Sequence, residues 1–252
     1  MSARTTVTAV AEGVARISWP TGESADVVRD EVAAALVGFA RVEAVLAVDA
    51  VTEQRTATWA GMHREGVLRG PLDPDGAPTD RVLYARLATD LPVTEPDGFR
   101  ALLNSFLPRK RAIAQTLIRD PDGRVLLCQL TYKRDWDLPG GVVEVGESPR
   151  LAAGREIGEE LDLTVEPGEL VLTDWLPPWG GWDDAVCLVF DGGTTAAAIV
   201  ERITPDPREI RTAEFCTPDQ VRERAADFTA RRVEAALAAL HGGPRYTESG
   251  RP

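Results

Sequence analysis

The hydrophobic and polar positions of the chain form two series of predicted elements, separated at residues 89–111 by a stretch with several prolines and a short predicted helical segment between them. In the first series, apolar positions at helical spacing after Ser24 indicate a helix with a hydroxyl cap. The predicted strands are residues 13–19, 42–49, 64–70 and 80–88, and the predicted helices are residues 25–40 and 52–61. This order is typical of an α/β domain.

The second series is richer in strands. The predicted strands are residues 111–119, 124–130, 169–176, 184–191 and 209–216, and the predicted helices are residues 149–161, 217–225 and 228–240. Changes in pattern and in proline content set the boundaries. We predict a first domain at residues 1–95, a linker at 96–108, a second domain at 109–241 and a flexible tail at 242–252.

Composition and charge limit the classes of function. The 252 residues include 44% hydrophobic and 27% charged residues, as in ordinary globular domains, and their net charge of −12 argues against a nucleic-acid partner. No apolar run approaches the roughly 18 residues that indicate a membrane span, so no membrane partner is expected. Three separated cysteines form neither a disulfide scaffold nor a zinc ribbon. We therefore expect a cytoplasmic protein.

The helix that follows Ser148-Pro149 carries an unusual group of acidic residues. Serine is a good N-cap and proline favours the first helical position, so the helix begins at this pair. Glu156, Glu159 and Glu160 are spaced i, i+3, i+4, which places three mutually repelling carboxylates on one face. Mg²⁺ or Mn²⁺ would remove the repulsion, because both ions prefer oxygen ligands. A solvated acidic face is the alternative interpretation.

The residues around this helix follow a fixed spacing. Gly141 is followed after five residues by Glu147, and seven residues later by a run from Arg155 to Leu163 with the sequence REIGEELDL. This resembles the Nudix box, G-x5-E-x7-R-E-U-x-E-E-x-G-U, where U is aliphatic. One fixed position differs, because Asp162 occupies the place of a glycine. Aspartate tolerates the left-handed backbone conformation better than most residues, so we expect Asp162 to adopt it.

The resemblance implies a Nudix fold, an α/β/α sandwich with a mixed sheet in the α/β (α+β) class. It implies a metal site whose Mg²⁺ ligands are Glu156, Glu159 and Glu160, together with the backbone carbonyl of Gly140 or Gly141. It also implies that Glu147 and Arg155 pair and brace the loop before the helix.

A base or a further metal ligand often lies outside the box in this family. Glu209 is our leading candidate for that role, and Glu214 is the second. Both could instead be ordinary carboxylates at a strand edge.

Aromatic and basic residues near the box are candidates for substrate binding. Tryptophan rings can stack on a nucleobase, and Lys or Arg can contact phosphate. The candidates are Trp136, Lys133, Arg134, Trp175, Trp179 and Trp182. Packing of the tryptophans in a rigid loop, and solvated surface charges, are equally compatible with the pattern.

Residues 60–90 resemble the last part of GNAT-type acetyltransferases. They contain Gly61-Met62, the Arg64-Glu65-Gly66 triplet, and a later glycine, aspartate and tyrosine in a similar order. The family's glycine-rich loop for coenzyme A is missing from residues 19–27, so the resemblance implies a truncated, non-catalytic half-fold. Such a half would leave an apolar sheet edge, which could be covered by pairing in a homodimer.

Three functions follow from these observations. The first is Mg²⁺-dependent hydrolysis of a diphosphate linkage in a nucleoside diphosphate linked to another group X, with a small-molecule nucleotide as substrate. The second is a nucleotide-metabolite sensor without turnover, although intact Glu156, Glu159 and Glu160 argue against it. The third is an acetyl-CoA-dependent acetyltransferase, which would need the missing loop.

Overall fold

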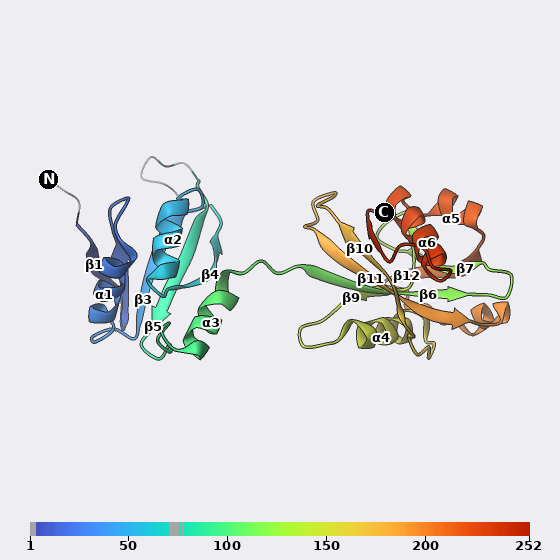
Figure 1. Ribbon diagram of the computed structural model, residues 1–252, viewed down its shortest axis with the longest axis horizontal. Coiled ribbons are helices and arrows are strands. Elements are labelled where there is room, and N and C mark those ends of the chain that lie inside the picture. The colour runs from blue at the N-terminus through green and yellow to red at the C-terminus, as the bar shows by residue number, and fades with distance from the viewer. Residues whose placement is uncertain (1–3, 71–75, 77) are drawn as a thin grey trace. The chain divides into compact units, whose positions relative to one another are not determined.

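The computed structural model describes residues 4–70, 76 and 78–252, which form two compact units, Met1–Pro108 and Arg109–Pro252 (Figure 1). The first unit has a sheet with strand order β1-β2-β3-β5-β4. Its elements are β1 Thr6–Ala11, β2 Val14–Ser18, α1 Ala25–Ala35, β3 Arg41–Ala47, α2 Val51–Trp59, β4 His63–Leu68, β5 Arg81–Leu87 and α3 Pro96–Phe106. The loop residues 71–75 and 77 lie outside the described residues.

One face of this first sheet is apolar and the other carries charge. Val28 and Val32 of α1 and Ala57 of α2 pack on the apolar face. On the other face, Arg16 pairs with Glu43 at 2.6 Å, and Arg41 with Glu65 at 2.6 Å. Charged pairs of this kind keep a sheet face compatible with water.

Two features of the first unit differ from expectation. Strand β1 was not predicted, because its side chains are mostly exposed and give no apolar alternation. Residues 96–108, predicted as a linker that contains a short helical stretch, belong to the first unit and are largely helix α3, which starts at Pro96. The hydroxyl of Ser105 in α3 accepts a hydrogen bond from the backbone N–H of Arg64 at 3.1 Å, which satisfies a donor of edge strand β4.

The second unit is built on a mixed sheet with strand order β12-β7-β6-β11-β10-β13, and β8 and β9 are added beside β7 and β6. β6 and β11 are parallel, as are β10 and β13, and the other pairs are antiparallel. The elements are β6 Arg111–Arg119, β7 Val125–Leu130, β8 Trp136–Asp137, β9 Gly140–Val142, α4 Pro149–Leu161, β10 Leu170–Leu176, β11 Ala185–Thr194, the 3₁₀ helix η1 Ala197–Arg202, β12 Ile210–Cys216, α5 Pro218–Arg224, α6 Asp227–Ala239 and β13 Tyr246–Glu248.

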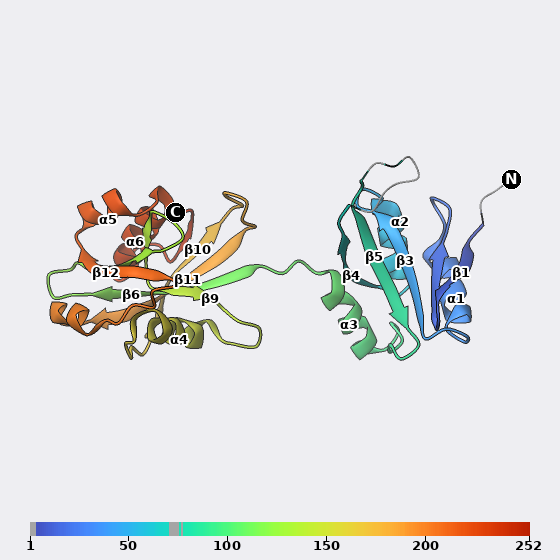
Figure 2. The same ribbon diagram turned by 180° about the vertical axis from the view of Figure 1, so that it is seen from behind.

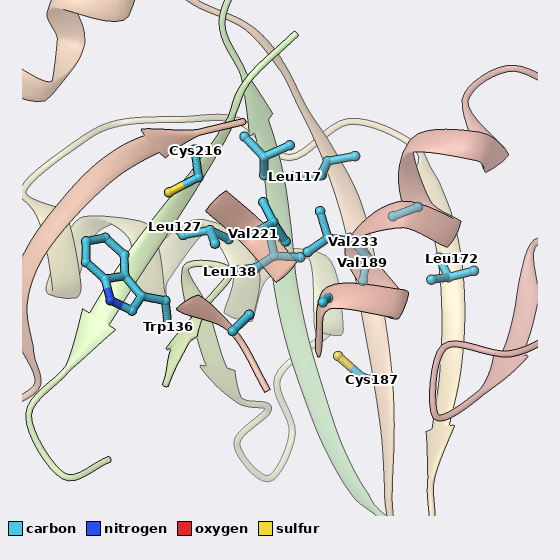
Figure 3. Packing of buried hydrophobic residues seen from close by; sticks show 14 of the residues in the cluster. Leu117, Leu127, Trp136, Leu138, Leu172, Cys187, Val189, Cys216, Val221 and Val233 are labelled. Carbon is cyan, nitrogen blue, oxygen red and sulfur yellow. The ribbon is translucent and has the colours of Figure 1, made fainter. Parts of the chain in front are cut away.

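Helices cover both faces of this sheet, with α4 on one side and α5 and α6 on the other (Figures 1 and 2). Alternate residues of β6 serve the two faces, as strand geometry requires: Ile118 packs with Ile157 of α4, and Leu117 packs with Val233 of α6. Figure 3 shows the second of these cores, in which Leu117, Leu138 and Val233 come together. The predicted α/β/α sandwich with a mixed sheet is therefore confirmed.

The end of the chain is ordered, so the expectation of a flexible tail at 242–252 was wrong. Strand β13 pairs in parallel with β10, and the N–H of Gly250 donates to Asp174 Oδ1 at 2.8 Å. The side chain of Thr247 is buried and also donates to Asp174 Oδ1, at 2.8 Å. A three-residue strand held by a buried carboxylate has no apolar pattern that the sequence could reveal.

The helices of the described part are short. The longest, α4 and α6, have 13 residues each. Within the described residues, none has the length and apolar character needed to cross a bilayer.

Candidate active site

The box region begins at β9, which pairs with the central strand β6, and continues through a loop into α4. The helix starts as predicted, with Ser148 Oγ accepting a hydrogen bond from the N–H of Leu151 at 3.4 Å. It ends at Asp162, whose φ of 54° and ψ of 35° are left-handed. Aspartate therefore adopts the conformation expected at this position of the box.

Glu160 lies at the deepest point of the carboxylate face. Glu160 is only 5% exposed, and its Oε2 accepts a hydrogen bond from the N–H of Gly140 at 3.0 Å. Burial raises the pKa of Glu160 to about 8, against the effect of the Gly140 bond, and Glu156 and Glu209 add to the rise. A carboxylate in this setting is stabilised by any cation placed beside it.

Arg155 organises the loop and the neighbouring glutamates. Its Nε and Nη2 donate to the two carboxylate oxygens of Glu147 at 2.9 and 3.0 Å. These hydrogen bonds are the main cause of the lowered pKa of Glu147. Its Nη1 lies 2.9 Å from Glu156 and 2.8 Å from Glu159. Arg155 thus offsets part of the repulsion among the glutamates when no metal is bound.

Glu209 meets the box glutamates in space although it is far from them in sequence. One pocket is lined by Glu156, Glu159, Glu160 and Glu209, and also by Gly140 and Gly141. The backbone carbonyl of Glu209, just before β12, accepts a hydrogen bond from the N–H of Thr131 at 2.8 Å. Glu214 does not line this pocket, and its carboxylate pairs with Arg224 at 2.7 Å.

The donor set of this carboxylate pocket fits a hard divalent cation. The lining side chains that could ligate a metal are carboxylates, without cysteine or histidine, which would suit Mg²⁺ or Mn²⁺ rather than Zn²⁺. A side chain at Gly141 would place its Cβ 2.6 Å from Glu156 Cδ, so the glycine makes room for that carboxylate. Among the described residues, no three Asp, Glu, His or Cys side chains already converge as a metal cage.

A second pocket lies beside the carboxylate pocket and shares Tyr132, Gly140, Gly141 and Val142 with it. The predicted residues Trp179, Trp182 and Lys133 line this adjacent pocket. The guanidinium of Arg111 lies over the rings of Trp179 and Trp182, at 5.1 and 4.8 Å from their centroids. These contacts fix the two tryptophans at the pocket.

The other substrate candidates lie elsewhere. Trp136 is 8% exposed, belongs to the α6-side core and has Arg224 stacked at 4.7 Å from its ring centroid. Trp175 lies in β10 between β11 and β13 and lines neither pocket. Arg134 lines neither of these pockets; it lines a third depression with Gln129 and Arg211, which shares Tyr132 and Lys133 with the adjacent pocket. The tryptophan pattern therefore could not distinguish packing from binding positions.

Sequence reasoning missed several polar residues of the two pockets. Gln115, Asp137 and Arg232 line the adjacent pocket, and Tyr132 lines both. Gln115 lies inside a predicted strand and Arg232 inside a predicted helix, far from the box. Only the fold brings them together, so no local signal marks them.

Comparison with known proteins assigns the chain to a family. A model of the NUDIX domain matches residues 108–237, which is just over half of the chain. The chain belongs to the Nudix hydrolase family. The match leaves the first unit uncovered, so the acetyltransferase resemblance of residues 60–90 stays a prediction.

Relatives of this Nudix hydrolase include a MutT-like protein of Streptomyces ambofaciens, 33% identical over 55% of this chain and 81% of the relative. The nucleoside triphosphatase NudI of Escherichia coli O1:K1 / APEC is 41% identical over 30% of this chain and 52% of the relative, so the match spans about half of NudI. Among solved structures, a MutT protein of Methanosarcina mazei Go1 aligns at 22% identity with a TM-score of 0.46, covering 54% of this chain and 99% of that one.

Proposed function

We propose that this Nudix hydrolase uses Mg²⁺ to hydrolyse a diphosphate linkage in a nucleotide, such as a nucleoside diphosphate linked to a group X. The observation that carries the proposal is the single pocket lined by Glu156, Glu159, Glu160 and Glu209. The partly matching relative NudI is a nucleoside triphosphatase, which supports a substrate with a phosphate chain.

The carboxylates have distinct roles in this proposal. Glu156, Glu159 and Glu160 hold the cation, with a backbone carbonyl of Gly140 or Gly141. A bound Mg²⁺ would neutralise the diphosphate oxygens and lower the pKa of a water molecule. Glu209 accepts the proton of the attacking water, a role that its position in the same pocket supports.

The charge of the chain makes the cation essential. Its net charge of −12, and the acidic side chains that line the pocket, repel a diphosphate. Lys133 lines the adjacent pocket but its Nζ already pairs with Asp137 at 3.0 Å. A divalent ion reverses the local field, which arginine and lysine here do only in part.

Phosphate release measures this activity directly. A panel of nucleoside diphosphates linked to sugars or to a second nucleoside, and of nucleoside triphosphates, is assayed with a coupled phosphatase in Mg²⁺ or in EDTA. We expect strong Mg²⁺-dependent turnover of one substrate class. No hydrolysis anywhere in the panel, with nucleotide binding still detectable by thermal shift, would favour the sensor interpretation instead.

Two variants test the assigned roles. Glu159→Gln removes a metal ligand and should lower turnover by roughly a hundredfold or more without loss of folding. Glu209→Gln should lower kcat with a smaller change in Mg²⁺ affinity. Glu214→Gln is the matched control for both, because its carboxylate lies outside the pocket and pairs with Arg224. Full activity of Glu159→Gln would refute the metal assignment.

A further inference from the structure

The pocket beside the carboxylates is lined by both apolar and polar residues. Ile113, Leu138, Leu176 and Phe228 supply apolar surface, and the shared residues Gly140 and Gly141 connect it to the proposed site of hydrolysis. A planar, mostly apolar group joined to a phosphate chain fits such an arrangement, because one part faces the apolar surface while the phosphates reach the metal.

Arg232 at this pocket is a buried cation, and one nitrogen of its guanidinium makes no hydrogen bond among the described residues. The residue is 2% exposed. Its Nε donates to Asp174 Oδ2 at 2.9 Å, and its Nη1 donates to Gln115 Oε1 at 3.0 Å. Its Nη2 is buried and has no hydrogen-bond partner in the described part of the chain. Buried polar atoms are nearly always paired, so an exception at a pocket points to a missing ligand atom.

The neighbours of Arg232 keep its guanidinium in place. Asp174 is itself held by Thr247 and Gly250, each at 2.8 Å. Gln115 donates through Nε2 to Asp137 Oδ1 at 2.9 Å, which directs its Oε1 toward Arg232. Both fixed partners accept from Arg232, so Nη2 remains the donor available to a bound molecule.

We infer that this pocket holds the nucleobase of the substrate and that Arg232 Nη2 donates to a carbonyl oxygen on the edge of the base opposite the sugar. The inference rests on the proposed function and names its substrate class. The edge in question carries O4 in uracil and thymine and O6 in guanine and hypoxanthine. Cytosine and adenine place an amino group there, so two donors would face each other and Nη2 would stay unpaired.

Matched substrates test the inference without changing the protein. UTP is compared with CTP and ITP with ATP, since the members of each pair differ in carrying oxygen or an amino group at this edge. We expect kcat/KM to be roughly ten- to a hundredfold higher for UTP and ITP, the range of a hydrogen bond to a charged group. The triphosphate of 2-pyrimidinone riboside, which lacks any group at position 4, should be as poor as CTP. Equal values across both pairs would overturn the inference.

A variant on the protein side isolates the donor. Arg232→Lys keeps a cation for Asp174 but removes the fork that supplies Nη2, so the UTP/CTP ratio should fall toward one, chiefly through loss of UTP turnover. Arg231→Lys is the control on the same helix, because its Nε donates to the carbonyl of Ser249 and it does not line the pocket. An unchanged ratio in folded Arg232→Lys would contradict the inference.

Binding separates this inference from the proposed activity. Dissociation constants of UTP and CTP are measured by calorimetry with Glu159→Gln, in which hydrolysis is suppressed. Tighter binding of UTP supports the base pocket even if no nucleotide is turned over. Hydrolysis of nucleotides without preference within either pair would leave the proposed function intact and refute the base assignment alone.

Discussion

The side chains of Gln115, Asp174 and Arg232 form a buried polar network at the adjacent pocket. Replacing Thr247 with valine tests whether the end of the chain holds this network in place. Asp174 is fully buried and receives three hydrogen bonds, from Thr247, Gly250 and Arg232. Valine keeps the size and β-branching of threonine, so Thr247→Val removes the hydroxyl donor with little change in packing. The carboxylate cannot replace that donor with water unless the strand β13 moves.

The expected loss of stability follows from the charge on the acceptor. A hydrogen bond to a charged group contributes about 1.5–3 kcal/mol, and a buried acceptor left unpaired bears the larger part of that cost. We therefore expect Thr247→Val to lower the free energy of unfolding of the unit Arg109–Pro252 by about 2 kcal/mol. For a unit of this size, that corresponds to a decrease of roughly 4–8 °C in Tm.

Urea unfolding followed by tryptophan fluorescence, with scanning calorimetry for Tm, measures the effect. Thr247→Ser is the matched control, because serine keeps the hydroxyl and loses only a methyl group, a change of about 1 kcal/mol or less. The reasoning would be refuted if Thr247→Val were as stable as the wild type, or if Thr247→Ser lost as much stability as Thr247→Val.

Three further predictions concern the carboxylate pocket. Gly141→Ala should raise the Mg²⁺ concentration needed for activity by roughly ten- to a hundredfold and leave Tm almost unchanged. The reason is that the atoms nearest to the new Cβ belong to the carboxylate of Glu156, which can move. Magnesium titrations check the first part and thermal scans the second. Gly140→Ala should instead destabilise the fold, because its Cβ would lie 2.1 Å from the backbone oxygen of Ala114 and its φ is 137°; a wild-type unfolding curve would contradict this. In EDTA the free energy of unfolding should decrease as pH rises from about 4.5 to about 8, by at most about 1.4 kcal/mol per pH unit. Folding raises the pKa of Glu160 to about 8, so in this range the folded state binds more protons than the unfolded state. Urea titrations at several pH values measure this slope, which should flatten in Glu160→Gln.

Much of the second unit could be predicted because its signals are local. Strand β6 and helix α4 have the predicted bounds, Arg111–Arg119 and Pro149–Leu161, since the turn residues 120–123 mark the end of one and a serine cap with proline marks the start of the other. The Nudix box also lies within one short stretch of chain. The pairing of Glu147 with Arg155 in the structure agrees with what the box implies.

The errors arose where structure depends on contacts between distant segments. The prolines at 92–108 suggested a linker with a short helical stretch, but the helix α3 is part of the first unit, where its Leu102 is buried. Trp136 looked like a stacking residue, yet its ring is enclosed by core side chains and by Arg224. Local composition is the same for an exposed ring and a buried one, so only the packing decides.

The buried polar network at the adjacent pocket shows the same limit most clearly. Gln115, Asp174 and Arg232 lie in two predicted strands and a predicted helix, and each alone resembles an ordinary polar position. Their meeting also recruits Thr247, which is buried in the segment that we expected to be a tail. If the network positions Arg232 for the base, Thr247→Val should reduce the UTP/CTP ratio as well as stability. A loss of stability with an unchanged ratio would mean that the chain end supports the fold but does not orient the donor.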